Sequence, residues 1–167
     1  YVYRSPTTTR PRETIFETVS VTEMTSHSCF GAGTLVRTLD GLKAIETINA
    51  GDTVLTQDTE TGAMSYHSVV VAYHNPPAAT YRIDVGDDSI VATGIHRFWK
   101  AGKGWVMARE LAAGDLLRMS QGVKSIKAVS EDKVQPVFNL QIADANTFLV
   151  GEQGVLVHDN SLITPAE

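Results

Sequence analysis

The only cysteine of the chain, Cys29, lies at the start of a glycine-containing turn in the stretch SCFGAGTLVRTLDG. A lone cysteine cannot form a disulfide within its own chain. Buried cysteines are most often inert apolar residues, whereas a thiolate next to a base or a cation is a strong nucleophile for a carbonyl carbon. Taken alone, Cys29 therefore leaves both interpretations open.

The second group of candidate residues lies at the end of the β-like run SIVAT, where Thr93 is followed by His96 in TGIHRFW. Gly94 between them permits a tight bend that would aim both side chains at one point. An imidazole can polarise a peptide carbonyl or act as a base near neutral pH, and a hydroxyl can hydrogen-bond to the same amide. The alternative is a structural histidine packed beside Phe98 and Trp99.

A third group lies in the stretch GVLVHDNS near the end of the chain: His158, Asp159, Asn160 and Ser161. An asparagine amide can attack its own main-chain carbonyl, form a succinimide and cut the chain after itself. A neighbouring histidine can then protonate the leaving amine. The alternative is a plain polar turn after a strand.

His67 and His74 are further candidates, seven residues apart in HSVVVAYH. An odd separation on a strand places two side chains on opposite faces, so we interpret both histidines as structural. We expect neither a metal ion nor a cofactor.

Composition and charge argue against several classes of function. The net charge is −5 and the isoelectric point is about 5.5, which gives no basic surface for nucleic acids or acidic membranes. No apolar run approaches the roughly 20 residues that span a bilayer. We expect one domain and a monomer, with no nucleic-acid or membrane partner.

Two regions of different composition follow one another along the chain. Residues 1–28 are threonine-rich with two prolines, and we interpret them as a flank or linker with one candidate strand at 14–21. From Cys29 onward, short β-like runs are separated by the turn formers DTETG, NPPA and GDD. These runs lie at 34–39, 52–58, 67–74, 80–85, 89–93, 137–142, 147–151 and 154–158. They predict an all-β domain, with single helical turns only within 42–50 and 105–113.

An internal repeat supports this organisation. GLKAIETINAGDTVL at 41–55 aligns without gaps on GWVMARELAAGDLLR at 104–118, 63 residues later. That spacing is too long for a solenoid repeat. It predicts two similar β halves related by a pseudo-twofold axis, which would bring distant segments of the chain together.

Across residues 29–159 the sequence resembles the Hint module shared by inteins, bacterial intein-like domains and Hedgehog autoprocessing domains. The stretches that show it are CFGAGTLVRTLDGLKAIETINAGDTVLTQDTETG, TGIHRFWKAGKGWVMARELAAGDLLR, VFNLQIADANTFLVG and GVLVH. It is most similar to the Hint domains that precede toxin or variable regions in large bacterial proteins. The resemblance implies a flattened β horseshoe of two pseudo-symmetric halves, a Hint domain at 29–160 and a C-terminal flank at 161–167.

The resemblance also implies a role for each candidate residue. The thiol of Cys29 would attack the carbonyl of Ser28 and convert a peptide bond to a thioester. Thr93 and His96 match the Thr-x-x-His motif that strains and polarises that amide, and His158 matches the histidine that assists C-terminal cleavage. The implied function is single-turnover autocatalytic processing in cis, by cleavage or by splicing.

Three positions depart from the family pattern. The family usually has asparagine where Asp159 stands, and Asp159 lacks the amide nucleophile. Asn160 could replace it if the register shifts by one residue, and Ser161 would then be a hydroxyl nucleophile. Asn139 and Asn146 stand where many inteins have aspartate and histidine, so we expect weaker coupling between the two cleavages and a slower C-terminal reaction.

Two further expectations follow. The chain begins without Met and without a signal pattern, so we expect a piece of a longer protein, and the sequence leaves its compartment open. The resemblance implies a larger bacterial protein, of the secreted or surface-associated class, whose flanking domains are its partners. The alternative function is a degenerate, inactive Hint fold that serves as a rigid connector. Sterol ligation and proteolysis in trans are disfavoured, because few residues follow Ser161 and the attacked bond precedes the nucleophile.

Overall fold

The computed structural model of the chain describes residues 28–161. The linker expected at 1–28, its candidate strand at 14–21 and the flank at 161–167 lie outside the described residues, except for Ser28 and Ser161. Two 3-10 turns, η1 (Ile45–Thr47) and η2 (Ala108–Glu110), are the helical segments of the described part, and they fall where single helical turns are predicted. The strands are β1 (Phe30–Gly31), β2 (Leu35–Thr38), β3 (Gly41–Ala44), β4 (Thr53–Gln57), β5 (Met64–Ala78), β6 (Thr80–Val85), β7 (Asp88–Thr93), β8 (Arg97–Lys100), β9 (Gly104–Met107), β10 (Leu116–Arg118), β11 (Val123–Glu131), β12 (Gln135–Ile142), β13 (Thr147–Val150) and β14 (Val155–His158).

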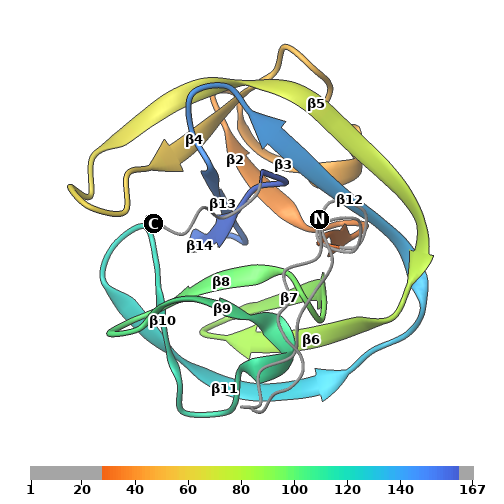
Figure 1. The fold of residues 1–167 in the computed structure, drawn as a ribbon, viewed down its shortest axis with the longest axis vertical. Coiled ribbons are helices and arrows are strands. Elements are labelled where there is room, and N and C mark those ends of the chain that lie inside the picture. The colour runs from red at the N-terminus through yellow and green to blue at the C-terminus, as the bar shows by residue number, and fades with distance from the viewer. Residues whose placement is uncertain (1–27, 162–167) are drawn as a thin grey trace, which may run out of the picture.

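The strand order is symmetric about the neighbouring strands β7 and β1, so the two halves of the fold have the same arrangement of strands. It runs β10-β11-β6-β7-β1-β12-β5-β4-β2-β13-β14-β8-β9, with β3 beside β2, and β10 also pairs with β8. The three strands β4, β5 and β12 of one half correspond to β10, β11 and β6 of the other. In Figure 1 the strands form a ring, with β5 and β12 side by side on its outside and the β13–β14 hairpin toward the middle. The all-β, two-half architecture expected from the sequence is confirmed.

The internal repeat of the sequence is also a structural repeat. β3 with η1 corresponds to β9 with η2, at positions 63 residues apart. Gly41 and Gly104 begin these strands with φ of 102° and 106°, a left-handed conformation that favours glycine. The carboxylates of Asp52 and Asp115 each accept a 2.9 Å hydrogen bond from the backbone N–H three residues earlier. The same side chain therefore closes the same turn in both halves.

The two halves meet at β1 and β7, which pair antiparallel. After β1, the N–H of Thr34 donates to the carbonyl of Gly31 at 3.3 Å; after β7, the N–H of His96 donates to the carbonyl of Thr93 at 3.1 Å. The turn that holds Thr93 and His96 is thus the counterpart of the turn that follows Cys29. The duplication places the two candidate groups on neighbouring strands at the centre of the molecule.

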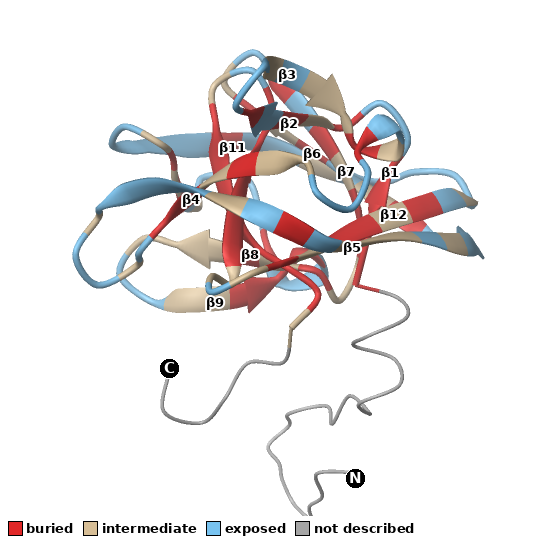
Figure 2. Cartoon of the chain, turned by 90° about the horizontal axis from the view of Figure 1, so that it is seen from above, coloured by how far each residue is buried: buried red, intermediate tan, exposed pale blue. Residues whose placement is uncertain are grey.

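The core surrounds this junction. Phe30, Phe98 and Phe148 are fully buried, and the Phe30 ring packs edge-on against the other two at 6.1 and 5.9 Å. The His96 ring is also fully buried, with its centroid 4.0 Å from that of Phe30. Figure 2 shows buried residues along the inner strands, whereas many residues of β5 are exposed. A rigid apolar core therefore supports the turn that carries His96.

One predicted turn is wrong. The stretch NPPA was expected to separate two strands, but it belongs to the 15-residue strand β5, which ends at Ala78. The register of β5 against β12 shifts between Gln135 and Val137, opposite this stretch. A bulge of this kind accommodates proline, which cannot donate to the ladder, so the strand continues through Pro76 and Pro77.

Candidate functional site

The peptide bond between Ser28 and Cys29 is buried, and its N–H group is held by Thr93. The N–H of Cys29 donates to the Thr93 hydroxyl oxygen at 2.9 Å, and the Thr93 N–H donates to the Cys29 carbonyl at 2.9 Å. The same hydroxyl donates to the Cys29 carbonyl at 3.3 Å. One side chain at the end of β7 therefore fixes the orientation of Cys29.

The carbonyl oxygen of Ser28 is held from the other side, by Asn139 of β12. The Asn139 side-chain amide nitrogen donates to this oxygen in a short hydrogen bond. The amide cannot turn easily, because its own oxygen accepts a 2.8 Å bond from the N–H of Leu140. A fixed donor on a carbonyl oxygen stabilises the negative charge that develops when the carbonyl carbon is attacked.

The thiol of Cys29 is buried and contacts Asn75 of β5, whose side-chain amide donates to Sγ at 3.0 Å. Burial raises the pKa of the Cys29 thiol to about 11, and the hydrogen bond from Asn75 opposes this rise. Two amide donors thus face the two reacting groups, Asn75 on the sulfur and Asn139 on the carbonyl oxygen.

His96 links the two junctions. Its Nε2 lies 2.9 Å from the carbonyl oxygen of His158, and its Nδ1 lies 3.3 Å from the hydroxyl of Ser28. Because a carbonyl oxygen can only accept, Nε2 bears the proton and Nδ1 accepts from Ser28. Burial lowers the pKa of His96 to about 3, so the ring is neutral at physiological pH.

Gly94 has a different role from the one expected. Its backbone is not in the left-handed region, so the bend itself does not require glycine. A Cβ at this position would instead lie 2.9 Å from Cε1 of Tyr81. Gly94 is therefore needed so that the Thr93–His96 turn can pack against the Tyr81 ring.

At the C-terminal junction, His158 and Asp159 are both buried. The Nδ1 of His158 lies 3.1 Å from the Asp159 carbonyl oxygen, and its ring packs against Trp105 at 4.9 Å. The Asp159 carboxylate also faces this ring, with Oδ1 3.6 Å from Nδ1 of His158. It accepts from the N–H of Ile142 at 3.0 Å and from the N–H and hydroxyl of Ser161 at 2.8 and 2.5 Å. Its backbone N–H donates to the Asn146 carbonyl at 2.9 Å.

Asn160 brings the two junctions together. Its side-chain oxygen lies 3.4 Å from the Asn139 amide nitrogen, which also donates to the Ser28 carbonyl. Its backbone N–H donates to the Leu140 carbonyl at 2.8 Å, and the residue is buried. Strand β12 thus holds residues from both ends of the described chain at one point.

The comparisons with known proteins agree with this geometry. The family model of the pretoxin HINT domain matches residues 35–160. A bacterial intein-like domain from Clostridium thermocellum is similar at 34% identity and a TM-score of 0.76, over 80% of this chain and 100% of that one. The chain belongs to the pretoxin HINT domain family.

Inteins of lower identity share the fold of this Hint domain. A DnaB intein from Synechocystis sp. PCC 6803 is similar at 18% identity and a TM-score of 0.72, over 80% of this chain and 99% of that one. The gp41-1 intein is similar at 23% identity and a TM-score of 0.66, over 78% and 98%. No curated protein matches the chain.

The structure of the Hint domain adds Asn75 to the candidate site and changes the interpretation of Asn139. Asn75 lies in the NPPA stretch, which the sequence predicts to be a turn, so its side chain is not among the predicted site residues. Asn139 is noted in the sequence only as a departure from the family pattern, yet it contacts both junctions. No local sequence pattern predicts the contacts of Asn75 or Asn139, because their partners lie far away in sequence.

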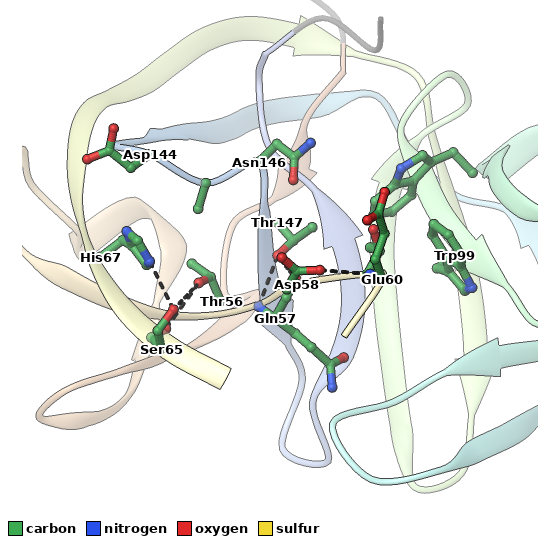
Figure 3. Close-up of a pocket in the computed structure, with 13 residues that line it drawn as sticks. Thr56, Gln57, Asp58, Glu60, Ser65, His67, Trp99, Asp144, Asn146 and Thr147 are labelled. Carbon is green, nitrogen blue, oxygen red and sulfur yellow. Dashed lines mark hydrogen bonds between the residues drawn. The ribbon is translucent and has the colours of Figure 1, made fainter. Parts of the chain in front are cut away.

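A surface hollow of about 430 Å³ in the Hint domain is lined in part by Trp105, which packs against His158, and by Asn146, whose carbonyl accepts from the N–H of Asp159 (Figure 3). Asp58, Glu60 and Asp144 line it with Trp99 and Asn146, whereas Ser28 and Cys29 do not. Its lining residue His67 contacts the Ser65 hydroxyl at 2.9 Å. The hollow therefore lies apart from the Cys29 sulfur.

The other histidine considered as a ligand, His74, packs edge-on against Phe138 at 5.1 Å. Within residues 28–161, no three side chains of His, Cys, Asp or Glu gather closely enough to hold a metal ion. In the same part of the chain, no helix has the length and apolarity that crossing a membrane requires.

Proposed function

We propose that this Hint domain processes its own chain, beginning with an N-to-S acyl shift at Cys29. The observation that supports this most strongly is the pair of side-chain hydrogen bonds made to the Ser28–Cys29 peptide bond. Asn139 donates to its carbonyl oxygen, and Thr93 accepts from its N–H. A buried peptide bond fixed by two side chains from different strands is the arrangement that an attack on that bond requires.

In the proposed step, Cys29 Sγ bonds to the carbonyl carbon of Ser28 through a five-membered ring. The carbonyl oxygen becomes negative and is stabilised by the Asn139 amide. The C–N bond then breaks, so that Ser28 is joined to sulfur as a thioester and the nitrogen of Cys29 becomes an amine. Because the reacting groups belong to adjacent residues, effective molarities of about 10⁵–10⁸ M are accessible to a well-oriented attack.

We assign proton transfer in this step to His96. The ring is neutral, and its Nδ1 lies 3.3 Å from the side chain of Ser28, the residue that supplies the attacked carbonyl. The Nδ1 lone pair, which accepts from the Ser28 hydroxyl before the reaction, can take the thiol proton and return it to the leaving nitrogen. Asn75 contributes by stabilising the thiolate that remains on Sγ.

The slower C-terminal cleavage, at Asp159 or Asn160, depends on His158. Its Nδ1 lies 3.1 Å from the Asp159 carbonyl oxygen, and its own carbonyl accepts from His96 Nε2 at 2.9 Å. A change in the protonation of His96 therefore changes the hydrogen bond to the carbonyl of His158, at the strand end that holds the second junction.

The experiment is a mass measurement on the full chain treated with hydroxylamine or a small thiol, both of which cleave thioesters but leave peptide bonds intact. The expected products are residues 1–28, carrying the reagent, and a fragment that begins at Cys29. Cys29→Ala is the control and gives neither. If the wild-type chain also gives neither under any condition of pH and temperature, the proposal is wrong.

One observation favours a second candidate, a rigid connector without activity. Burial raises the pKa of the Cys29 thiol to about 11, so little thiolate exists at neutral pH in the folded state. In that case wild type and Cys29→Ala would stay intact to the same extent under every condition.

The family name gives the proposed context. Pretoxin HINT domains lie within larger toxin proteins, and we propose that this chain is a piece of such a bacterial protein, secreted or surface-associated. Its partners would then be the flanking domains of the same polypeptide, and the processing would separate or join them.

A further inference from the structure

The surface hollow beside Trp105 is lined by acidic and aromatic side chains. Its volume of about 430 Å³ lies within the range of sites that hold small ligands, about 300–1,000 Å³. The carboxylates of Asp58, Glu60 and Asp144 all line it (Figure 3). Among the described residues that form its wall there is no lysine or arginine. The lining therefore has an excess of negative charge.

These carboxylates have few partners within residues 28–161. Glu60 and Asp144 form no ion pair and no side-chain hydrogen bond there. Oδ1 of Asp58 accepts from the N–H groups of Glu60 and Thr61 at 2.8 and 3.0 Å, and its Oδ2 remains available. Carboxylates that line one hollow without a cation repel each other, and a bound cation would remove this repulsion.

Two tryptophan rings line the same hollow. Trp99 and Trp105 are half-buried and pack edge to face, with their centroids 5.1 Å apart. The guanidinium of Arg118 lies 5.5 Å from the centroid of Trp99 and donates to the Thr59 carbonyl at 2.9 Å. The protein thus already holds one guanidinium with an aromatic ring and an oxygen of the β4–β5 loop. Trp105 has no cation over its ring in the described part of the chain.

A buried acceptor in the wall of the hollow lacks a donor. Gln57 lines the hollow and is 8% exposed, and its Oε1 has no hydrogen-bond partner among the described residues. Its Nε2 donates to the Gly62 carbonyl at 3.2 Å, so the amide is held with Oε1 as the unpaired atom. A buried acceptor without a donor costs free energy, and a ligand rich in N–H groups would remove that cost.

We propose that this hollow binds the guanidinium group of an arginine carried by a polypeptide segment. A guanidinium is planar, stacks on an aromatic ring and presents several N–H donors that match carboxylate oxygens in pairs, whereas an ammonium is a strongly hydrated point charge. The two tryptophan rings, the carboxylates of Glu60 and Asp144 and the unpaired oxygen of Gln57 are the partners that this group needs.

The arginine has two possible sources, this chain and a separate polypeptide. Residues 1–12 contain Arg4, Arg10 and Arg12 and no acidic residue, so their charge is complementary to that of the hollow. From Arg12 to Ser28 an extended chain reaches roughly 50 Å, at about 3.3 Å per residue. A domain of this size has a radius of gyration of roughly 14 Å, so the chain is long enough to reach any face of it.

The test protein is the full chain with four substitutions. Cys29→Ala blocks the proposed processing, so the result does not depend on the thioester. Arg4→Gln, Arg10→Gln and Arg12→Gln remove the arginines of residues 1–12, so that they cannot compete for the hollow. We call this protein the flank variant.

The first test uses tryptophan fluorescence, because Trp99 and Trp105 are the two tryptophans of the chain and both line the hollow. N-acetyl-arginine amide, added to the flank variant, should give a saturable change in emission. N-acetyl-citrulline amide has an uncharged urea group in place of the guanidinium and should give none. A saturable response to neither compound, or an equal response to both, would overturn the proposal.

The second test concerns the carboxylates. Glu60→Gln and Asp144→Asn together, in the flank variant, should weaken binding about tenfold or more, because they remove charged acceptors. Both side chains are exposed, and asparagine tolerates the left-handed backbone of residue 144, whose φ is 56°, so the fold should be retained. Asp87→Asn with Glu131→Gln changes two exposed carboxylates that do not line the hollow and is the matched control. Equal affinities of the two double variants would contradict the site.

The source of the arginine follows from a comparison of the flank variant with Cys29→Ala alone. If residues 1–12 fill the hollow, the flank variant binds N-acetyl-arginine amide more tightly, because a tethered competitor has been removed. If the arginine belongs to a separate polypeptide, the two proteins bind it alike. Either result retains the site, whereas a flank variant that binds no arginine amide overturns it.

Discussion

The side-chain amide of Asn139 donates a hydrogen bond to the carbonyl oxygen of Ser28, 111 positions earlier in the chain. Its own oxygen accepts from Leu140 N–H at 2.8 Å, and this bond fixes the amide plane. Strand β12, which pairs with β1 and β5, thereby reaches the peptide bond that precedes Cys29. In an acyl shift this donor is the one that faces the developing oxyanion.

Asn139→Asp should slow thioester formation about 10²–10³-fold, the usual cost of removing one such donor. The substitution keeps the acceptor for Leu140 and the size of the side chain, replaces the donating NH₂ group by oxygen, and in its ionised form adds a negative charge that also opposes the oxyanion. The rate is measured as release of residues 1–28 by hydroxylamine over time. An unchanged rate would mean that the bond to Ser28 plays no part in the reaction.

Thr93→Val should both destabilise the fold and slow the shift. It leaves the buried N–H of Cys29 without the acceptor at 2.9 Å, which costs about 1–3 kcal/mol of unfolding free energy. Thr93→Ser retains the hydroxyl and should recover most of both losses. Urea unfolding in a Cys29→Ala background measures the stability, and hydroxylamine release measures the rate. Equal behaviour of the Val and Ser variants would contradict the role of the hydroxyl.

Asn75→Ala should raise the pKa of the Cys29 thiol further, because it removes the hydrogen bond that opposes burial. A hydrogen bond to an ionised group contributes about 1.5–3 kcal/mol, so the expected change is about one pKa unit or more. Since the chain has one cysteine, a ¹³C label on cysteine Cβ gives a single NMR signal that follows the titration. Val70→Ala, an exposed residue on the same strand, is the control. A pKa equal to that of wild type would remove Asn75 from the site.

His96 should make the fold sensitive to acid. Burial lowers its pKa from 6.5 to about 3, so the unfolded chain binds a proton in this interval and the folded chain does not. The contribution to stability is complete above pH 6.5 and is lost as the pH falls toward 3, by up to roughly 1.4 kcal/mol per pH unit. Urea unfolding of Cys29→Ala, with and without His96→Gln, between about pH 7 and pH 4 measures it. The same slope in both proteins would contradict a neutral, buried ring.

The fold could be predicted because its signals are local or repeated. The alternating short strands, the turns at DTETG and GDD and the repeat at 41–55 and 104–118 each depend on residues close in sequence. The prediction for the NPPA stretch was wrong, because a proline pair favours a turn. The bulge in the pairing with β12 that allows the strand to continue cannot be seen in the sequence. Strand β11 was not expected, because its polar, exposed residues give a weak strand pattern.

The site was predictable only in part. Cys29 directly precedes β1, Thr93 ends β7 and His96 lies in the turn after it. The repeat brings these two strands together, so the proximity of the three residues follows from the duplication. The donors Asn75 and Asn139 depend on the register of β5 and β12 against the rest of the sheet. Register is fixed by tertiary packing and by the bulge, and no local pattern of residues reports it. The Asp159–Ser161 contact depends likewise on where the chain leaves β14.

The central claim is that the carbonyl of Ser28 moves from nitrogen to sulfur. With ¹³C in the serine carbonyl groups, NMR of the full chain follows this carbon directly, because a thioester carbonyl resonates far downfield of any peptide carbonyl. A signal at the thioester position that grows as the pH is raised, and that is absent from Cys29→Ala, is the predicted result. A spectrum in which every serine carbonyl keeps its peptide position at every pH would contradict it.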